Sequence, residues 1–190
     1  LGDWAHPYTT MTNAAEARIV RELGKFLMNG ALYRGSKPVL WSVVEKTALA
    51  EAEVEYHDHV SATAFVRFPV VRTANAALEG ADVVIWTTTP WTIPGNRAIA
   101  YGEAIDYGLY RVDTVADGAL VRPGDRLLVA TLCAERARAA GKVQDWTLEK
   151  TLPGRAFEGV VCHHPLRASG YAFDVPMLAG DFVETESGTG

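Results

Sequence analysis

The chain has 190 residues, of which 48% are hydrophobic and 22% are charged, and its net charge is −5. This composition is ordinary for a globular protein, and no apolar run approaches the roughly 18 residues of a membrane span. The negative charge disfavours a protein that works mainly by contacting nucleic-acid phosphates, because such proteins are usually basic. Cys133 and Cys162 form no CxxC pair, so we expect no disulfide framework and a reducing, cytoplasmic location.

Residues 1–47 are predicted to form a helical entry segment and a connector. The opening residues LGDWAHP contain no basic stretch followed by an apolar one, so a signal peptide is not expected. Thr12 or Asn13 can cap a helix, apolar residues then recur at helical spacing, and Gly30 ends it. Residues 32–41 include Gly35 and Pro38 and are expected to be extended.

Residues 48–190 are predicted to form a second domain, built from short strands and few helices. Residues 64–71 and 81–86 are rich in β-forming side chains, and residues 122–125 form a turn before a strand at 126–130. Residues 131–140 form a short helix that Gly141 closes. Further strands are expected at residues 107–112, 146–152, 159–162 and 171–175. Many short strands favour an α+β, mostly β fold with a barrel or curved sheet, rather than a doubly wound sheet.

The stretch WTTTPWTIPGN, residues 86–96, is the most unusual part of the sequence. A strand of buried type runs directly into three threonines, and Pro90 then ends the pairing because it has no backbone donor. Hydroxyl groups and free amides therefore gather at a strand end, where they suit a ribose, a carbonyl or a water. The simpler interpretation, that threonines favour strands and Pro90 makes a turn, is also open. No Ser-His-Asp arrangement accompanies the motif, so any chemistry would depend on positioning and electrostatics.

At this point the sequence resembles the editing domains of isoleucyl-tRNA synthetases. WTTTPWTIPGNRAIA is similar to the threonine-rich peptide of that family. Thr89 and Trp91 are of the isoleucyl type, since leucyl and valyl relatives usually have arginine and an acidic residue there. The resemblance continues in four segments in the family's order, which are GDWAHPYTTM, LYRGSKPVLW, TALAEAEVEY and the terminal ESGTG.

The resemblance implies a barrel-like editing domain of the valyl/isoleucyl/leucyl type, which hydrolyses mischarged Val-tRNA(Ile) and valyl-adenylate. It implies that Thr87 and Thr88 contact the terminal ribose and the attacking water. Thr89 and Trp91 would form the wall that meets the amino-acid side chain. Thr92 and Asn96 would have supporting roles. The implied partners are the 3′ end of tRNA(Ile) carrying valine and the remainder of the synthetase chain, with no membrane.

The resemblance also implies a parent enzyme that attaches isoleucine to tRNA(Ile) using ATP and Mg²⁺. The HIGH and KMSKS signatures of that reaction are not in this sequence, and we expect no cofactor in the chain itself. The family's editing histidine and key aspartate would follow Gly190, so we expect the 190-residue chain to deacylate slowly by itself. Many relatives have a zinc-binding CxxC where this sequence has Ser42 and Glu45, so no metal is expected.

Other polar clusters are predicted to be solvated rather than functional. His57 and His59 follow a polar stretch, and His163 and His164 precede a proline, which favours loop positions over metal ligation. Glu51, Glu53 and Glu55 alternate, which on a strand would give one solvated face. Two rival functions remain open at this stage: a non-catalytic connective module that positions the tRNA acceptor end, and a β-rich domain that binds a small ligand.

Overall fold

The structure, a computed structural model, describes residues 2–186 and divides into two compact units, Leu1–Asp58 and His59–Gly190. The last four residues of the ESGTG motif lie outside the described residues. The first unit contains α1 (Asn13–Met28), the short antiparallel pair β1 (Trp41–Ser42) and β2 (Thr47–Ala48), and the 3-10 turn η1 (Glu51–Glu53).

Helix α1 confirms the predicted helix and its cap. The Thr12 side chain accepts a hydrogen bond from the Ala15 amide at 3.3 Å, which satisfies one of the free donors at the helix start. Lys25 pairs with Glu22 at 2.7 Å, one turn earlier on the same helix. Neither α1 nor the other helix of the described residues is long and apolar enough to cross a membrane.

The three alternating glutamates do not lie on a strand, so the strand geometry considered for them from the sequence is wrong. Glu51 and Glu53 belong to η1, where the Glu53 carboxylate accepts a hydrogen bond from the Ala50 amide at 2.8 Å. A carboxylate that caps its own turn stabilises that turn, and this local bond competes with extended backbone. The expectation that the three side chains are solvated holds, since all are exposed.

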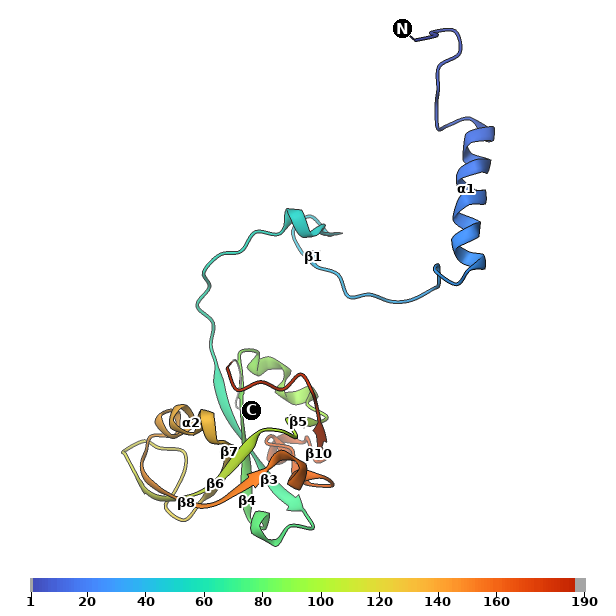
Figure 1. Cartoon of the computed structure of the whole chain (residues 1–190). Coiled ribbons are helices and arrows are strands. Elements are labelled where there is room, and N and C mark those ends of the chain that lie inside the picture. The colour runs from blue at the N-terminus through green and yellow to red at the C-terminus, as the bar shows by residue number, and fades with distance from the viewer. Residues whose placement is uncertain (1, 187–190) are drawn as a thin grey trace. The chain divides into compact units, whose positions relative to one another are not determined.

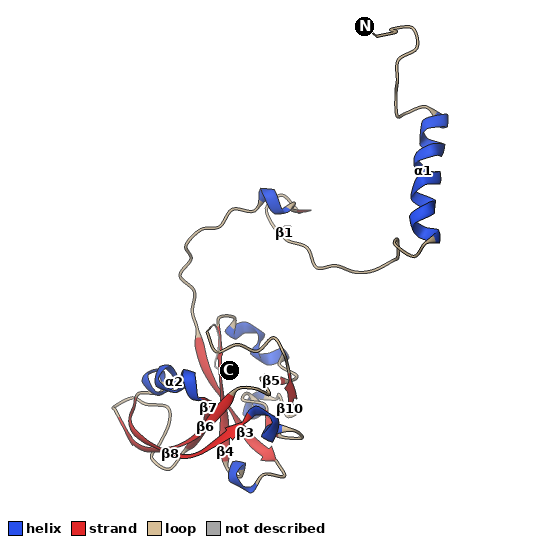
Figure 2. Cartoon of the chain, in the orientation of Figure 1, coloured by secondary structure: helices blue, strands red, loops and turns tan. Residues whose placement is uncertain are grey.

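The second unit is built around one eight-stranded mixed sheet, and the prediction of a mostly β, α+β fold is confirmed (Figures 1 and 2). The strand order across the sheet is β5-β10-β9-β3-β4-β7-β6-β8. β5–β10 and β4–β7 are parallel neighbours, and the other pairs are antiparallel. The strands in chain order are β3 (Ala64–Arg72), β4 (Ala81–Thr87), β5 (Ile99–Tyr101), β6 (Asp106–Val115), β7 (Arg126–Ala130), β8 (Val143–Pro153), β9 (Val161–His163) and β10 (Asp174–Ala179).

Most predicted elements have the predicted type, and their ends differ by a few residues. β7 coincides with the predicted strand, whereas β10 lies three residues later than predicted because β10 pairs with β9 and β5 rather than following local preference. The helix predicted over residues 131–140 forms as the 3-10 turn η4 (Thr131–Cys133) followed by α2 (Ala134–Ala140). Gly141 closes it, donating to the Ala137 carbonyl at 2.9 Å.

Register shifts between β6 and β8 bend the long pair that forms one end of the sheet. The core lies against this sheet, and Phe68 and Phe157 are fully buried within it. Tyr101 and Tyr107 contact the Phe157 ring edge-on, with centroids 5.6 and 4.8 Å away. Gly154 allows two segments to meet, because a Cβ atom there would lie 1.9 Å from the Gly102 carbonyl oxygen.

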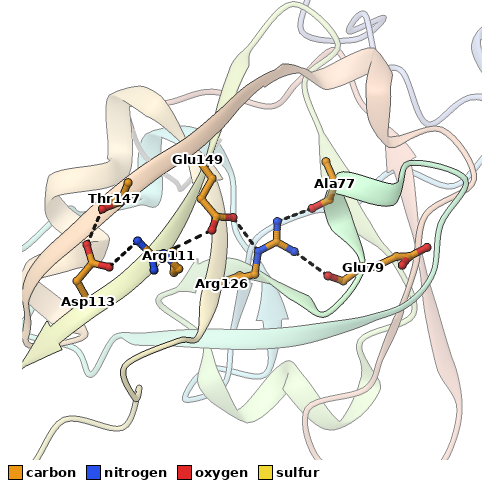
Figure 3. Close-up of polar contacts among 7 residues, drawn as sticks. All are labelled: Ala77, Glu79, Arg111, Asp113, Arg126, Thr147 and Glu149. Carbon is orange, nitrogen blue, oxygen red and sulfur yellow. Dashed lines mark hydrogen bonds and ion pairs between the residues drawn. The ribbon is translucent and has the colours of Figure 1, made fainter.

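A line of charged side chains joins β6, β7 and β8 on one side of the sheet (Figure 3). The Arg126 guanidinium donates to the carbonyl oxygens of Ala77 and Glu79 at 2.9 and 2.7 Å, and to the Glu149 carboxylate at 2.8 Å. Glu149 also lies 3.6 Å from Arg111. Since Ala77 and Glu79 lie immediately before β4, Arg126 attaches the start of that strand to its neighbour β7. This attachment positions the strand whose other end carries the candidate site.

Candidate functional site

The candidate site lies where β4 ends and includes an adjoining cavity of about 270 Å³ within the second unit. The cavity is lined mainly by apolar side chains of β4, β5, β7 and β10. Its polar lining residues are Asn96, Tyr107 and Glu184. An apolar cavity with a few convergent polar groups is the usual form of a small-molecule site, and this volume is at the small end of that range.

The threonine-rich loop, which we define as residues 87–96, adjoins this cavity and contains a chain of hydroxyl groups. The Thr87 and Thr89 hydroxyl oxygens are 3.2 Å apart, and those of Thr89 and Thr92 are 3.4 Å apart. The Thr89 amide donates to the Thr87 hydroxyl oxygen at 3.0 Å, and the Thr92 hydroxyl donates to the Thr89 carbonyl oxygen at 2.7 Å. Three groups that both donate and accept therefore stand in contact at the strand end.

The structure brings some of the predicted site residues together and separates others. Thr87, Thr89 and Thr92 share the hydroxyl chain, and Asn96 lines the cavity with its side-chain amide donating to the Ala98 carbonyl at 3.0 Å. Thr88, Thr89 and Thr92 are all exposed, and the hydroxyl chain runs through Thr89 and Thr92 rather than Thr88. The Trp91 side chain is 71% exposed on η3 (Pro90–Gly95), outside the cavity lining.

Sequence reasoning missed several residues of the site. Trp86 lines the cavity, and the Arg136 guanidinium of α2 lies 5.3 Å from the centre of its ring, a cation–π contact. The signal for Trp86 was available, since it ends the apolar run of β4. Glu184 also lines the cavity, from a segment almost 100 residues away in the chain, and nothing local in the sequence points to it.

His164 lies in the turn after β9, in keeping with the predicted loop, but the expectation that it is solvated is wrong. Its side chain is 1% exposed, and its Nε2 atom is 2.8 Å from the Ile93 carbonyl oxygen in η3. The neighbouring His163 belongs to β9 and contacts Asp174 of β10 at 2.8 Å. That hydrogen bond is the main reason why the pKa of the Asp174 carboxyl group is lowered. The pairing of β9 with β10 buries His164 among aromatic rings, which the local sequence did not reveal.

The two thiols are not nucleophiles in this site. Burial raises the pKa of the Cys162 thiol to about 12, and burial also raises the pKa of the Cys133 thiol. A thiol must ionise to attack, so burial lowers the reactivity of both groups. The polar side chains at the strand end are instead the threonine hydroxyls, with Asn96 and Glu184 in the cavity lining.

Ser42 and Glu45, at the position of the zinc-binding CxxC of relatives, form a local turn contact. The Ser42 hydroxyl donates to the Glu45 carboxylate, and this bond is the main reason why the pKa of Glu45 is lowered. Across the described residues 2–186, no group of three or more His, Cys, Asp and Glu side chains is placed to hold a metal ion.

Comparison with known proteins places the chain in a family. The family described as tRNA synthetases class I (I, L, M and V) matches residues 1–175. The chain is 54% identical to the isoleucine–tRNA ligase of Gluconobacter oxydans, covering 99% of this chain and 20% of the relative. It is 52% identical to that of Bradyrhizobium diazoefficiens and 53% identical to that of Caulobacter vibrioides, covering 100% of this chain and 19% and 20% of those relatives.

The chain thus spans about one fifth of the length of the curated relatives it matches. The solved structure "The crystal structure of GlLeuRS-CP1" aligns with a TM-score of 0.47 and 13% identity, covering 67% of this chain and 52% of that one. The resemblance to isoleucyl-tRNA synthetases predicted from the threonine-rich peptide is confirmed by the sequence relatives. Because the family match extends over residues 1–175, this chain belongs to the class I tRNA synthetases of the isoleucine, leucine, methionine and valine group.

Proposed function

We propose that this chain is the editing region of an isoleucine–tRNA ligase, and that it hydrolyses the ester of valine wrongly attached to tRNA(Ile). The observation that carries the proposal is the chain of three threonine hydroxyls beside a small apolar cavity. In the parent enzyme, isoleucine would be attached to tRNA(Ile) with ATP and Mg²⁺ at a separate synthetic site. Valyl-adenylate is a second substrate of the same proposed reaction class.

A second site is needed because one methylene group gives limited selectivity in an apolar pocket. Isoleucine–tRNA ligases are themselves the standard illustration of this limit, with about 150-fold discrimination between isoleucine and valine. A cavity that admits valine and excludes isoleucine would multiply that selectivity. The cavity of about 270 Å³ and its apolar lining support an occupant of amino-acid size rather than a whole nucleotide.

The proposed mechanism relies on positioning, with the threonine hydroxyls placing the water and the ester rather than attacking the ester themselves. The hydroxyls of Thr87 and Thr88 would hold the terminal ribose and the attacking water, with Thr87 held in turn by Thr89. Water would attack the ester carbonyl, the ester bond would break, and the ribose oxygen would leave with a proton. Correct placement of water and ester can by itself supply a large part of the rate enhancement.

Selectivity in this proposal depends on the walls of the cavity. Thr89 and Trp91 would meet the amino-acid side chain, with Thr92 and Asn96 supporting them. Trp91 is exposed on η3 and lies outside the cavity lining, so its proposed contact requires bound substrate to extend over the loop. Asn96 lies in the cavity lining and would contact the substrate from inside.

The test compares threonine variants in a full-length isoleucine–tRNA ligase that contains this chain. Thr87→Ala and Thr88→Ala should each slow Val-tRNA(Ile) hydrolysis about 10-fold or more, the scale of one or two lost hydrogen bonds. Aminoacylation should be nearly unchanged. Thr151→Ala, an exposed threonine of β8, is the matched control and should leave both rates unchanged.

Trp91→Ala tests substrate selectivity in the same experiment. A smaller side chain at the proposed wall should permit hydrolysis of Ile-tRNA(Ile). If Trp91→Ala loses valine hydrolysis without gaining isoleucine hydrolysis, Trp91 only supports the loop. Unchanged deacylation in both Thr87→Ala and Thr88→Ala would remove the threonines from the mechanism. The chain would then fit the alternative role of a non-catalytic module that positions the tRNA acceptor end.

A further inference from the structure

The second unit contains a buried histidine whose two ring nitrogens both have partners. His164 Nδ1 accepts a hydrogen bond from the Leu166 amide at 3.2 Å. Since Nδ1 is the acceptor, the proton of the neutral ring lies on Nε2, which then donates to the Ile93 carbonyl oxygen at 2.8 Å. This second bond joins segments 71 residues apart, and it connects the turn after β9 to η3 of the threonine-rich loop.

The Ile93 carbonyl oxygen is also the acceptor for the Asn96 amide, at 2.9 Å. Asn96 lines the cavity, so a single carbonyl group links His164 to a site residue. Two positions of the loop cannot donate backbone hydrogen bonds, since Pro90 and Pro94 have no N–H. A bond from outside the loop therefore has more influence here than it would in a regular helix.

The ring of His164 is itself held by aromatic neighbours. Its centroid lies 4.7 Å from that of Phe173 and 5.4 Å from that of Tyr171, and Phe68 meets it edge-on at 6.4 Å. Packing on several sides leaves the ring one orientation, so the direction of the Nε2–H bond is set by the core. A rigid donor of this kind can define where a flexible loop lies.

We propose that His164 is a positioning residue of the editing site, which holds the Ile93 carbonyl and through it Asn96 and the threonine-rich loop. The inference rests on the proposed editing function and adds a residue that does not itself touch substrate. Two substitutions separate the roles of the two nitrogens. Gln places an amide near the position of Nε2, whereas Asn places one near Nδ1 and cannot reach the Ile93 carbonyl oxygen.

In the full-length ligase, we expect His164→Asn to lower kcat for Val-tRNA(Ile) hydrolysis about tenfold, with KM little changed. His164→Gln should stay within about threefold of the wild type, and neither variant should alter aminoacylation. Val175→Ala is the stability control, because it removes buried volume from the core that also contains Phe68. It should lower the melting temperature without changing deacylation.

A readout that does not depend on editing comes from amide hydrogen exchange in the 190-residue chain. His164→Asn should speed exchange of the Asn96 amide at least severalfold, while His164→Gln should not. The Val112 amide of β6, which lies outside the loop and donates to the Asp125 carbonyl oxygen at 2.8 Å, is the internal reference.

The outcomes separate the two proposals. If the wild-type ligase does not hydrolyse Val-tRNA(Ile), the proposed function fails, and hydrogen exchange still decides whether His164 holds the loop. If the wild type is active and His164→Asn is equally fast, the inference is wrong. Equal losses in the Asn and Gln variants, in proportion to their melting temperatures, would also overturn it, since His164 would then serve only stability.

Discussion

The two units of the chain both contain apolar residues in regular secondary structure, but only one of them buries those residues. In α1 the apolar side chains at helical spacing, Ile19, Leu23, Phe26 and Leu27, are all more than half exposed. None of the described residues of this first unit is buried, whereas the second unit holds a continuous core around its sheet. The comparison shows that a helix can be specified by its own cap and spacing, while burial requires a partner surface. A 16-residue helix is only marginally stable by itself in water.

The strongest test of this comparison replaces one phenylalanine in each unit. Phe68 is 0% exposed in the core and Phe26 is 56% exposed on α1. Phe68→Ala should lower the free energy of unfolding by about 3–5 kcal/mol, because it removes buried contacts and leaves a cavity. Phe26→Ala should change it by less than about 0.5 kcal/mol. Urea denaturation followed by circular dichroism measures both, and equal losses would show that α1 also packs in a core.

An intermediate effect is expected from the charged line of Figure 3. Arg126→Met should cost about 1–2 kcal/mol of stability, because two carbonyl groups and the Glu149 carboxylate lose their donor. Arg122→Met, an exposed arginine on the preceding turn, serves as the matched control and should be close to neutral. The same denaturation experiment compares them. Similar urea midpoints for the two variants would mean that water satisfies the groups that Arg126 binds, with no loss of stability.

The smallest effect concerns two Asp–His pairs, one in each unit. His6 lowers the pKa of Asp3 within one local turn, and His163 lowers the pKa of Asp174 across the β9–β10 pair. A carboxyl group whose folded pKa is lowered adds stability above its ordinary pKa, and this contribution is lost as the pH falls through the folded value. His163→Gln should therefore move the pKa of Asp174 back up toward its ordinary value, as NMR titration would measure.

Unfolding sharpens this last comparison. In urea, the pKa of Asp174 should return to its ordinary value together with the loss of the sheet, since the β9–β10 pairing brings His163 to it. The pKa of Asp3 should follow a different and more gradual course, because its partner is three residues away in the chain. Coincident changes at the two carboxyl groups would show that the first unit unfolds cooperatively with the second.

Several features of the fold could be predicted because their signals are local. The Thr12 cap and the spacing of α1, the turn at residues 122–125 and the apolar strand β7 are each determined within about ten residues. The family resemblance likewise came from a continuous stretch, residues 86–100. The limits of β10 and the existence of β5 were not predicted, because these short strands form by pairing with each other and with β9.

The residues of the candidate site also divide into those that the local sequence indicates and those that depend on tertiary structure. The threonines, Trp91 and Asn96 could be selected from the sequence because they belong to one unusual stretch, and their roles remain predictions. His164 and Glu184 could not be selected, since their relation to that stretch exists only after strands from distant parts of the chain have paired. For this reason, the burial of His164 was not predicted.

The sequence by itself determined the family, the mostly β character and the loop where hydroxyl groups gather, because motif, strand preference and proline act over short distances. Only the tertiary structure decided which side chains enclose the cavity and which groups hold the loop. A hydrogen bond such as that from His164 to the Ile93 carbonyl joins residues 71 positions apart. Its partners are chosen by sheet register and core packing, which no local pattern contains.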